Sequence, residues 1–141
     1  MYYSMCKQKV VKNMEQPNMN NQSAKKKILV AEDTESNYML VSFILKNDYE
    51  LLWAHDGVEA LEMYESAKPD LILMDVRMPR LGGMTVTSRI REQDKTTPII
   101  ALTAFAFESD KNKTIESGCT DFMAKPINAK NLKEMVKKYI G

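Results

Sequence analysis

Residues that build disulfides and transition-metal sites are scarce in this chain. Its 141 residues include two cysteines and one histidine. Cys6 and Cys119 lie far apart and show no paired spacing, so the pattern indicates neither a disulfide framework nor a zinc site. We interpret both thiols as bystanders rather than functional groups.

Long hydrophobic runs are also missing. No apolar stretch of the sequence approaches the roughly 20 residues that a membrane-spanning helix needs. The N-terminal region is polar and dotted with lysines, and it lacks the apolar segment typical of a secretory signal. We therefore expect a cytoplasmic protein whose sequenced segment makes no membrane contact.

Glycine-rich phosphate loops do not occur either. In a nucleotide-binding domain, glycines follow the first strand, whereas this chain has Glu32-Asp33-Thr34-Glu35 at that position. The sequence thus argues against nucleotide binding.

The net charge of +1 hides an uneven distribution. Residues 1–27 carry six lysines and one glutamate, whereas residues 28–141 carry 14 basic and 18 acidic side chains. No aromatic residues are interleaved with the cluster at residues 25–27, so we expect no direct nucleic-acid binding. Residues 13–23 have too little apolar surface to offset the entropy lost on ordering. Residues 1–24 are therefore predicted to be a flexible tail or linker, with one domain over residues 25–141.

From Ile28 onward, short apolar segments alternate with segments of helical character. The predicted strands cover residues 28–31, 51–54, 71–75, 98–102 and 121–124. The first three helices are predicted over about residues 35–46, 58–68 and 84–93. A fourth helix, whose start the sequence does not define, ends at Ser117, and a fifth contains Leu132 to Ile140. This alternation predicts an α/β fold with a doubly wound parallel sheet covered on both faces.

Large apolar residues recur in the first predicted helix at the spacing of one helical face. They are Leu40, Val41, Phe43, Ile44 and Leu45. We expect Phe43, like Trp53 and Tyr64, to be core or partly buried packing rather than part of a cofactor site. His55 follows a strand beside a turn and is expected to be an exposed side chain.

Polar residues stand at the ends of four predicted strands. Glu32 and Asp33 follow the first predicted strand, and Asp75 ends the third. Thr103 follows the fourth strand and Lys125 the fifth. Because the carboxyl ends of parallel strands meet at one edge of the sheet, we expect these side chains to converge there. Clustered carboxylates with no His or Cys nearby favour a hard cation such as Mg²⁺. An incoming phosphoryl group, held by Mg²⁺ and Lys125, would be attacked in line by the Asp75 carboxylate.

Motifs in the same order resemble the receiver domain of two-component response regulators. The resemblance covers about residues 26–140 and rests on Ala31-Glu32-Asp33, Asn37, the run from Ala54 to Leu61, Asp75-Val76-Arg77-Met78-Pro79, Gly82-Gly83, Leu102-Thr103-Ala104 and Lys125-Pro126. It implies a flavodoxin-like (βα)5 fold with strand order 2-1-3-4-5. The run from Ala54 and the Met78-Pro79 pair look most like the receivers of hybrid sensor histidine kinases.

The resemblance also implies a phosphorylation site. Asp75 would be the phosphoacceptor, and Mg²⁺ would be held by Glu32, Asp33, Asp75 and the backbone carbonyl of Arg77. Lys125 would contact the phosphoryl oxygens. The donor would be a sensor histidine kinase or a histidine phosphotransfer protein.

A switch is implied beside that site. Thr103 would close on the phosphoryl group and Phe122 would rotate, changing the face formed by the fourth helix, fifth strand and fifth helix. The bond between Lys125 and Pro126 would be a cis peptide that aims the lysine inward.

Water reaching the acyl phosphate would pass between Arg77 and Phe105. Both side chains are bulky, and neither is a carboxylate or amide suited to orienting water, so we predict slow self-dephosphorylation. The chain would thus be a signalling domain that assists its own phosphorylation and slow dephosphorylation, rather than an enzyme acting on other substrates.

Two other functions deserve comparison. A haloacid-type hydrolase also uses a strand-end aspartate, but it needs an acid two residues later, where this chain has Arg77. A docking module of the same fold that acts without phosphorylation remains the alternative, and the intact set of acids argues against it.

Overall fold

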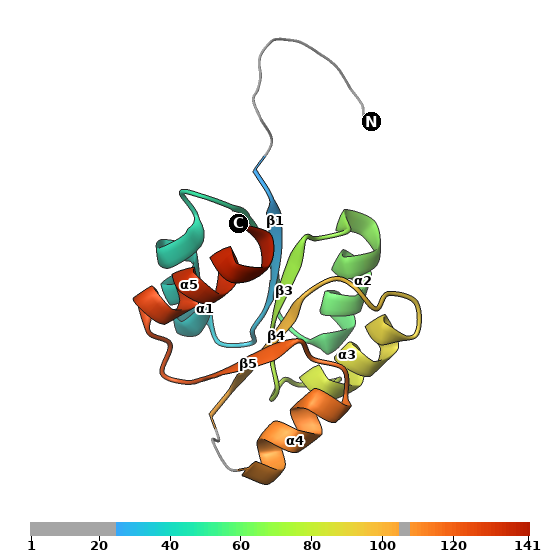
Figure 1. Ribbon diagram of the computed structural model, residues 1–141. Coiled ribbons are helices and arrows are strands. Elements are labelled where there is room, and N and C mark those ends of the chain that lie inside the picture. Colours follow the sequence, from blue (N-terminus) through green and yellow to red (C-terminus); the bar gives the residue numbers. More distant parts are fainter. Residues whose placement is uncertain (1–24, 105–107) are drawn as a thin grey trace, which may run out of the picture.

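The computed structural model describes residues 25–104 and 108–141, and in this part of the chain strands and helices alternate throughout (Figure 1). The strands are β1 (Lys27–Ala31), β2 (Glu50–Ala54), β3 (Leu71–Asp75), β4 (Ile99–Thr103) and β5 (Asp121–Ala124). The helices are α1 (Glu35–Leu45), α2 (Gly57–Ala67), α3 (Gly83–Arg91), α4 (Glu108–Glu116) and α5 (Ala129–Ile140).

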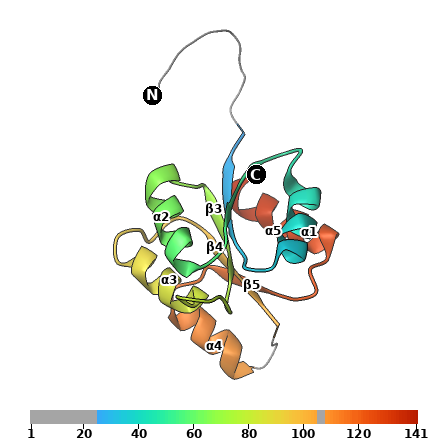
Figure 2. The same cartoon turned by 180° about the vertical axis from the view of Figure 1, so that it is seen from behind.

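The five strands form one parallel sheet in the order β2-β1-β3-β4-β5. The predicted doubly wound fold and strand order are therefore confirmed. Two views related by a half turn show α1 and α5 on one face of the sheet and α2, α3 and α4 on the other (Figures 1 and 2). Because helices cover both faces, every residue of the inner strands β3 and β4 is buried.

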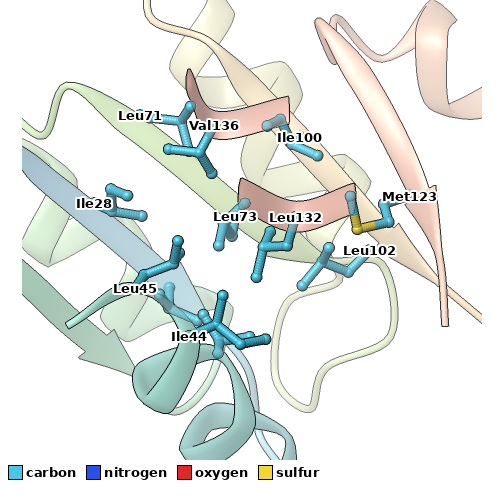
Figure 3. Packing of buried hydrophobic residues seen from close by; sticks show 12 residues of the cluster. Ile28, Ile44, Leu45, Leu71, Leu73, Ile100, Leu102, Met123, Leu132 and Val136 are labelled. Atoms are coloured by element: carbon cyan, nitrogen blue, oxygen red, sulfur yellow. The ribbon is translucent and has the colours of Figure 1, made fainter. Parts of the chain in front are cut away.

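Each face of the sheet has its own hydrophobic core, since successive residues of a strand point to opposite faces. On one side, Ile28, Leu73 and Ile100 of the sheet pack against Leu132 and Val136 of α5 (Figure 3). On the other side, Leu29, Ile72 and Ile99 of the sheet form a second core with Val86 and Ile90 of α3.

The first helix departs from its predicted burial. Val41, Ile44 and Leu45 are buried, but Leu40 is 41% exposed and Phe43 is 76% exposed. The prediction that Phe43 belongs to the core is wrong, because the helix turns this side chain outward and only a narrower stripe faces α5 and the sheet. Tyr64 is buried and Trp53 is partly buried, as predicted.

The β2–α2 and β3–α3 turns depend on a close backbone approach at Gly57 and on a left-handed residue, Arg80. Asp56 caps α2 by accepting a hydrogen bond from the backbone N–H of Glu59. The next residue, Gly57, packs so closely on Leu81 that a Cβ atom would overlap the Leu81 carbonyl. Arg80 adopts the left-handed conformation, with φ of 68°, and its guanidinium pairs with the Asp56 carboxylate at 2.7 Å. The β3–α3 connection is thus tied to the start of α2.

Among the described residues, no helix is both long and apolar enough to cross a lipid bilayer.

Candidate functional site

The candidate site lies where the order of the strands reverses. Within the sheet, β2 lies on one side of β1, and the chain then crosses over so that β3 lies on the other side of β1. In sheets of this type, ligands bind beyond the carboxyl ends of the strands at such a reversal, which here are the ends of β1 and β3. Glu32 and Asp33 follow β1 directly, and Asp75 is the last residue of β3.

Glu32 is a carboxylate with no exposed surface. Its Oε1 accepts a hydrogen bond from Lys125 Nζ at 3.1 Å, and its Oε2 accepts one from the Thr34 backbone N–H at 3.2 Å. The Asn37 side-chain amide lies 3.4 Å from the same Oε2. Such partners are what a buried charged group needs, because an unpaired charge in this position would be very costly.

Asp75 is 5% exposed and holds two hydrogen bonds. Its Oδ1 accepts from the Arg77 backbone N–H at 3.0 Å, and its Oδ2 accepts from Lys125 Nζ at 3.1 Å. Burial raises the pKa of Asp75 to about 6, and the negative charge of Glu32 acts in the same direction against the opposing Arg77 and Lys125 bonds. The carboxyl therefore sits in surroundings that disfavour its own charge.

Lys125 bridges the two buried acids from the end of β5. Its Nζ lies 3.1 Å from both Glu32 Oε1 and Asp75 Oδ2. Although burial opposes it, the pKa of Lys125 is raised because both carboxylates favour the ammonium form. The Lys125–Pro126 peptide bond is cis, and the Lys125 N–H bonds the Thr103 carbonyl at 2.7 Å.

The donor atoms present suit a hard divalent cation. Glu32, Asp33 and Asp75 each offer a carboxylate oxygen, and these oxygens lie within 4.8 Å of one another. Asp33 is exposed, so the group opens to solvent on one side. The group holds three carboxylates, whereas the ammonium of Lys125 pairs with two of them, Glu32 and Asp75. A divalent cation would offset the remaining negative charge. Oxygen-only ligands with an open side are the pattern that Mg²⁺ prefers.

The other predicted site residues that the structure describes come from β4, β5 and the segment after β3. Thr103 ends β4, the strand beside β3, and is 6% exposed. Phe122 is a half-buried residue of β5 that packs against the core on the α2 and α3 side. The Arg77 side chain is exposed beside Asp75. Phe105, which was predicted to slow dephosphorylation, lies outside the described residues.

Two contacts near the site were not anticipated from the sequence. Trp53 was interpreted as packing only, yet its indole N–H donates to the Glu32 carbonyl at 2.7 Å. The pairing of Arg80 with Asp56 likewise joins two loops at the edge of the site. Neither contact has a sequence signal, because each depends on how the β1–β2 and β3–α3 segments meet in space.

Comparison with known proteins gives a consistent result. Residues 28–137 match the sequence profile described as the response regulator receiver domain. The polar-differentiation response regulator DivK of Brucella anthropi is 34% identical over 119 residues, which cover 82% of this chain and 97% of that protein. Hybrid signal transduction histidine kinase I of Dictyostelium discoideum is 41% identical over 130 residues, which cover 85% of this chain and 8% of the kinase.

Solved structures show the same similarity. The receiver domain of a sensor histidine kinase from Pseudomonas aeruginosa has 35% sequence identity and a TM-score of 0.78, with 84% of this chain and 99% of that chain covered. That structure has a magnesium ion coordinated in its active site cleft. A putative response regulator from Chloroflexus aurantiacus superposes with a TM-score of 0.79 at 31% identity, over 82% of this chain and 98% of that one.

Proposed function

Because the chain belongs to the response regulator receiver domain family, we propose that it is a phosphorylation-dependent switch in which Asp75 accepts a phosphoryl group from a phosphohistidine donor. The observation that carries this proposal is the grouping of the carboxylates of Glu32, Asp33 and Asp75, two of which, Glu32 and Asp75, are bonded to the ammonium of Lys125. Aspartate carboxylates can act as nucleophiles toward a phosphoryl group, and a divalent cation and a lysine commonly hold the phosphoryl oxygens in such transfers.

The chemistry follows from these positions. A carboxylate oxygen of Asp75 attacks the phosphorus in line, a new P–O bond forms, and the P–N bond to the donor imidazole breaks as that ring takes up a proton. Mg²⁺ bound by Glu32, Asp33, Asp75 and the Arg77 carbonyl would supply positive charge toward the phosphoryl oxygens. Lys125, already within 3.1 Å of Asp75, would follow the transferred group and contact one of its oxygens.

Phosphorylation changes the balance of charge at the site. The phosphoryl group carries about two negative charges and strong acceptor oxygens, and these replace the single charge of the Asp75 carboxylate beside Lys125. The Thr103 hydroxyl at the end of β4 would bond those oxygens and draw in the segment that follows it. Phe122 on the neighbouring strand would move into the vacated space, so that the face formed by α4, β5 and α5 would carry the signal.

The donor is proposed to be a sensor histidine kinase or a histidine phosphotransfer protein. The similarity to a hybrid kinase and to a receiver of a sensor histidine kinase supports this class of partner. An aspartyl phosphate that lasts would suit relay to a further protein, and the bulky Arg77 beside Asp75 is consistent with slow hydrolysis.

The test is intact mass after incubation with acetyl phosphate and Mg²⁺, beside an Asp75→Asn variant and an EDTA control. We expect a gain of one phosphoryl group that requires both Mg²⁺ and Asp75. If acetyl phosphate gives no gain, the same measurement is repeated with phosphorylated histidine kinases, since small donors are not universal.

Absence of any gain with protein donors as well would contradict the proposal. That result would favour the alternative of a receiver-fold docking module that acts without phosphorylation. A gain that persists in Asp75→Asn would instead place the acceptor elsewhere in the chain.

A further inference from the structure

Trp53 is the single tryptophan of the chain, and it lies on the edge strand β2 directly opposite Val30 of β1. Its partly buried indole points to the α1 side of the sheet, where it meets the segment that carries the acids. The indole N–H donates to the Glu32 carbonyl oxygen at 2.7 Å. This is a short hydrogen bond to the backbone of a residue with no exposed surface.

The backbone of Glu32 is therefore held by β2 through both of its polar groups. The Glu32 N–H donates to the Ala54 carbonyl at 3.0 Å, as a continuation of the parallel ladder. After Ala54 the chain turns toward α2, so Trp53 supplies from its side chain the donor that the Glu32 carbonyl accepts. Without the indole, this carbonyl would lose its protein donor at the point where the acidic segment leaves the sheet.

Contacts with two other rings limit how far the indole can move. The Tyr38 ring stacks parallel to it, with ring centroids 4.3 Å apart and an interplanar angle of 2°. The His55 ring also lies against the indole, with centroids 4.0 Å apart and the two planes tilted by 30°. His55 is itself held by Glu59, whose Oε1 lies 2.8 Å from Nδ1. The indole is thus packed between α1 and the β2–α2 turn.

We propose that Trp53 is a positioning residue for the cation site, acting through the backbone of Glu32 to fix the direction in which Glu32 and Asp33 present their carboxylates. The inference rests on the proposed Mg²⁺ site and adds a residue that touches neither the cation nor the phosphoryl group. Groups that orient metal ligands in this way commonly change metal affinity when they are removed. It follows that cation binding alters the surroundings of the indole.

The test compares Trp53→Phe with Tyr64→Phe. The first variant keeps an aromatic ring against Tyr38 and His55 but removes the donor to Glu32. The second removes a hydrogen bond of similar length, from the Tyr64 hydroxyl to Asp94 at 2.6 Å, on the part of α2 that lies away from the acids. Amide chemical shifts of each protein are followed during titration with Mg²⁺, and urea unfolding confirms that each variant is folded.

We expect Trp53→Phe to bind Mg²⁺ about 10-fold more weakly than the wild type, with Tyr64→Phe unchanged. Mg²⁺ should also alter the fluorescence of the wild-type indole, with half-saturation at the concentration found from the amide shifts. Unchanged affinity in Trp53→Phe would overturn the inference and leave the proposed function standing. Failure of the wild type to bind Mg²⁺ would overturn both.

Trp53→Phe could fail to fold, in which case Tyr38→Leu takes its place. This variant keeps the indole donor and removes the ring stacked on it, so weaker Mg²⁺ binding is again expected. Affinity equal to that of the wild type would then overturn the inference.

Discussion

At the scale of single residues, Asp75 shows how surroundings change the chemistry of a side chain. An exposed aspartate is ionised at neutral pH at no cost, but Asp75 is buried beside a second buried acid, and its pKa is raised to about 6. The folded protein therefore holds a charge at this position against a penalty. This is typical of groups that act on a ligand rather than stabilise the fold.

Asp75→Asn is expected to make the protein more stable near neutral pH. For an acid whose folded pKa is raised, the penalty is absent below the unfolded pKa and is complete above the folded one. A shift of about two units corresponds to about 2.7 kcal/mol, a value that already includes the opposing ionic bond to Lys125. The amide replaces the protonated carboxyl only in part, so the expected gain is smaller. We expect a gain of about 1–2 kcal/mol in the free energy of unfolding, measured by urea titration with EDTA near pH 7.5.

The pH dependence of this gain provides the control. The gain should shrink as the pH falls from about 6 toward 4, where the wild-type carboxyl becomes protonated and resembles the amide. A stability difference that stayed constant over this range would show that charge is not its cause.

The sequence predicted which polar residues lie at the strand ends, but it did not predict which other side chains form hydrogen bonds to them. Glu32, Asp75 and Lys125 were found because parallel strands necessarily bring their carboxyl ends together. Trp53 was not found, since its contact with Glu32 depends on the register of an edge strand and on the angle of its side chain. Phe43 was predicted to be core or partly buried because it belongs to a run of five large apolar residues at helical spacing. Five such residues cannot all face one side of a short helix, and the spacing did not reveal that Phe43 would be exposed.

At the scale of elements, the β3–α3 connection is held very close to the site. The backbone N–H of Gly83 bonds the Val76 carbonyl at 3.1 Å, and its α-carbon lies against the end of β3. A Cβ atom at Gly83 would overlap the carbonyl oxygen of Asp75 and meet the Met74 side chain at 3.0 Å. At Gly82 the nearest atom to a Cβ would be the Val76 carbonyl oxygen at 3.7 Å, an ordinary contact.

Alanine substitutions at these two neighbouring glycines therefore serve as a test and its control. Gly83→Ala should lower the free energy of unfolding by about 1–3 kcal/mol and slow phosphorylation by acetyl phosphate, because relief of the overlap must displace the loop next to Asp75. Gly82→Ala should leave both properties near wild type. Urea unfolding and the rate of mass gain measure the two effects, and equal behaviour of the variants would contradict this packing argument.

Helix α1 presents an apolar outer surface next to the acids. Met39 is 60% exposed, Leu40 is 41% exposed and Phe43 is 76% exposed. The helix begins at Glu35, two residues after Asp33, so a protein that brings a phosphohistidine to Asp75 would come close to this surface. Exposed apolar groups gathered in this way are typical of contact with another protein.

Phe43→Ala is expected to slow phosphoryl transfer from a protein donor by about 10-fold, as loss of a buried aromatic contact does. Its rate with acetyl phosphate should not change, because that donor needs no docking surface. Ile115→Ala, which alters another exposed apolar residue on α4, is the matched control and should transfer normally. An equal loss with both donors would show that Phe43→Ala disturbs the site itself rather than docking.

At the scale of the whole molecule, the described residues form one hydrophobic core on each face of the sheet. The first core joins the sheet to α1 and α5, and the second joins it to α2 and α3. Five alternating strand and helix segments were enough to predict this architecture, because each apolar strand needs cover on both faces. The exact limits of α3 and α4 were harder to predict, since both helices have few large apolar residues.

A protein shortened to residues 25–141 is expected to fold as the full chain does. We predict that its unfolding midpoint in urea and its phosphorylation by acetyl phosphate will match those of the full chain, since residues 25–141 contain the buried clusters on both faces of the sheet and the candidate site. A marked loss of stability on removal of residues 1–24 would place the domain boundary earlier than proposed.

The two ends of the described domain meet on the side of the sheet that lies away from the acids. β1 starts there and α5 finishes there, and Lys26 Nζ donates to the Ile140 carbonyl at 2.6 Å (Figure 1). Polypeptide attached at either end would leave from this shared point without crossing the carboxylates. The domain could therefore be joined to a longer chain through this one region of its surface. The edge of the sheet that carries the carboxylates would then stay accessible to other molecules.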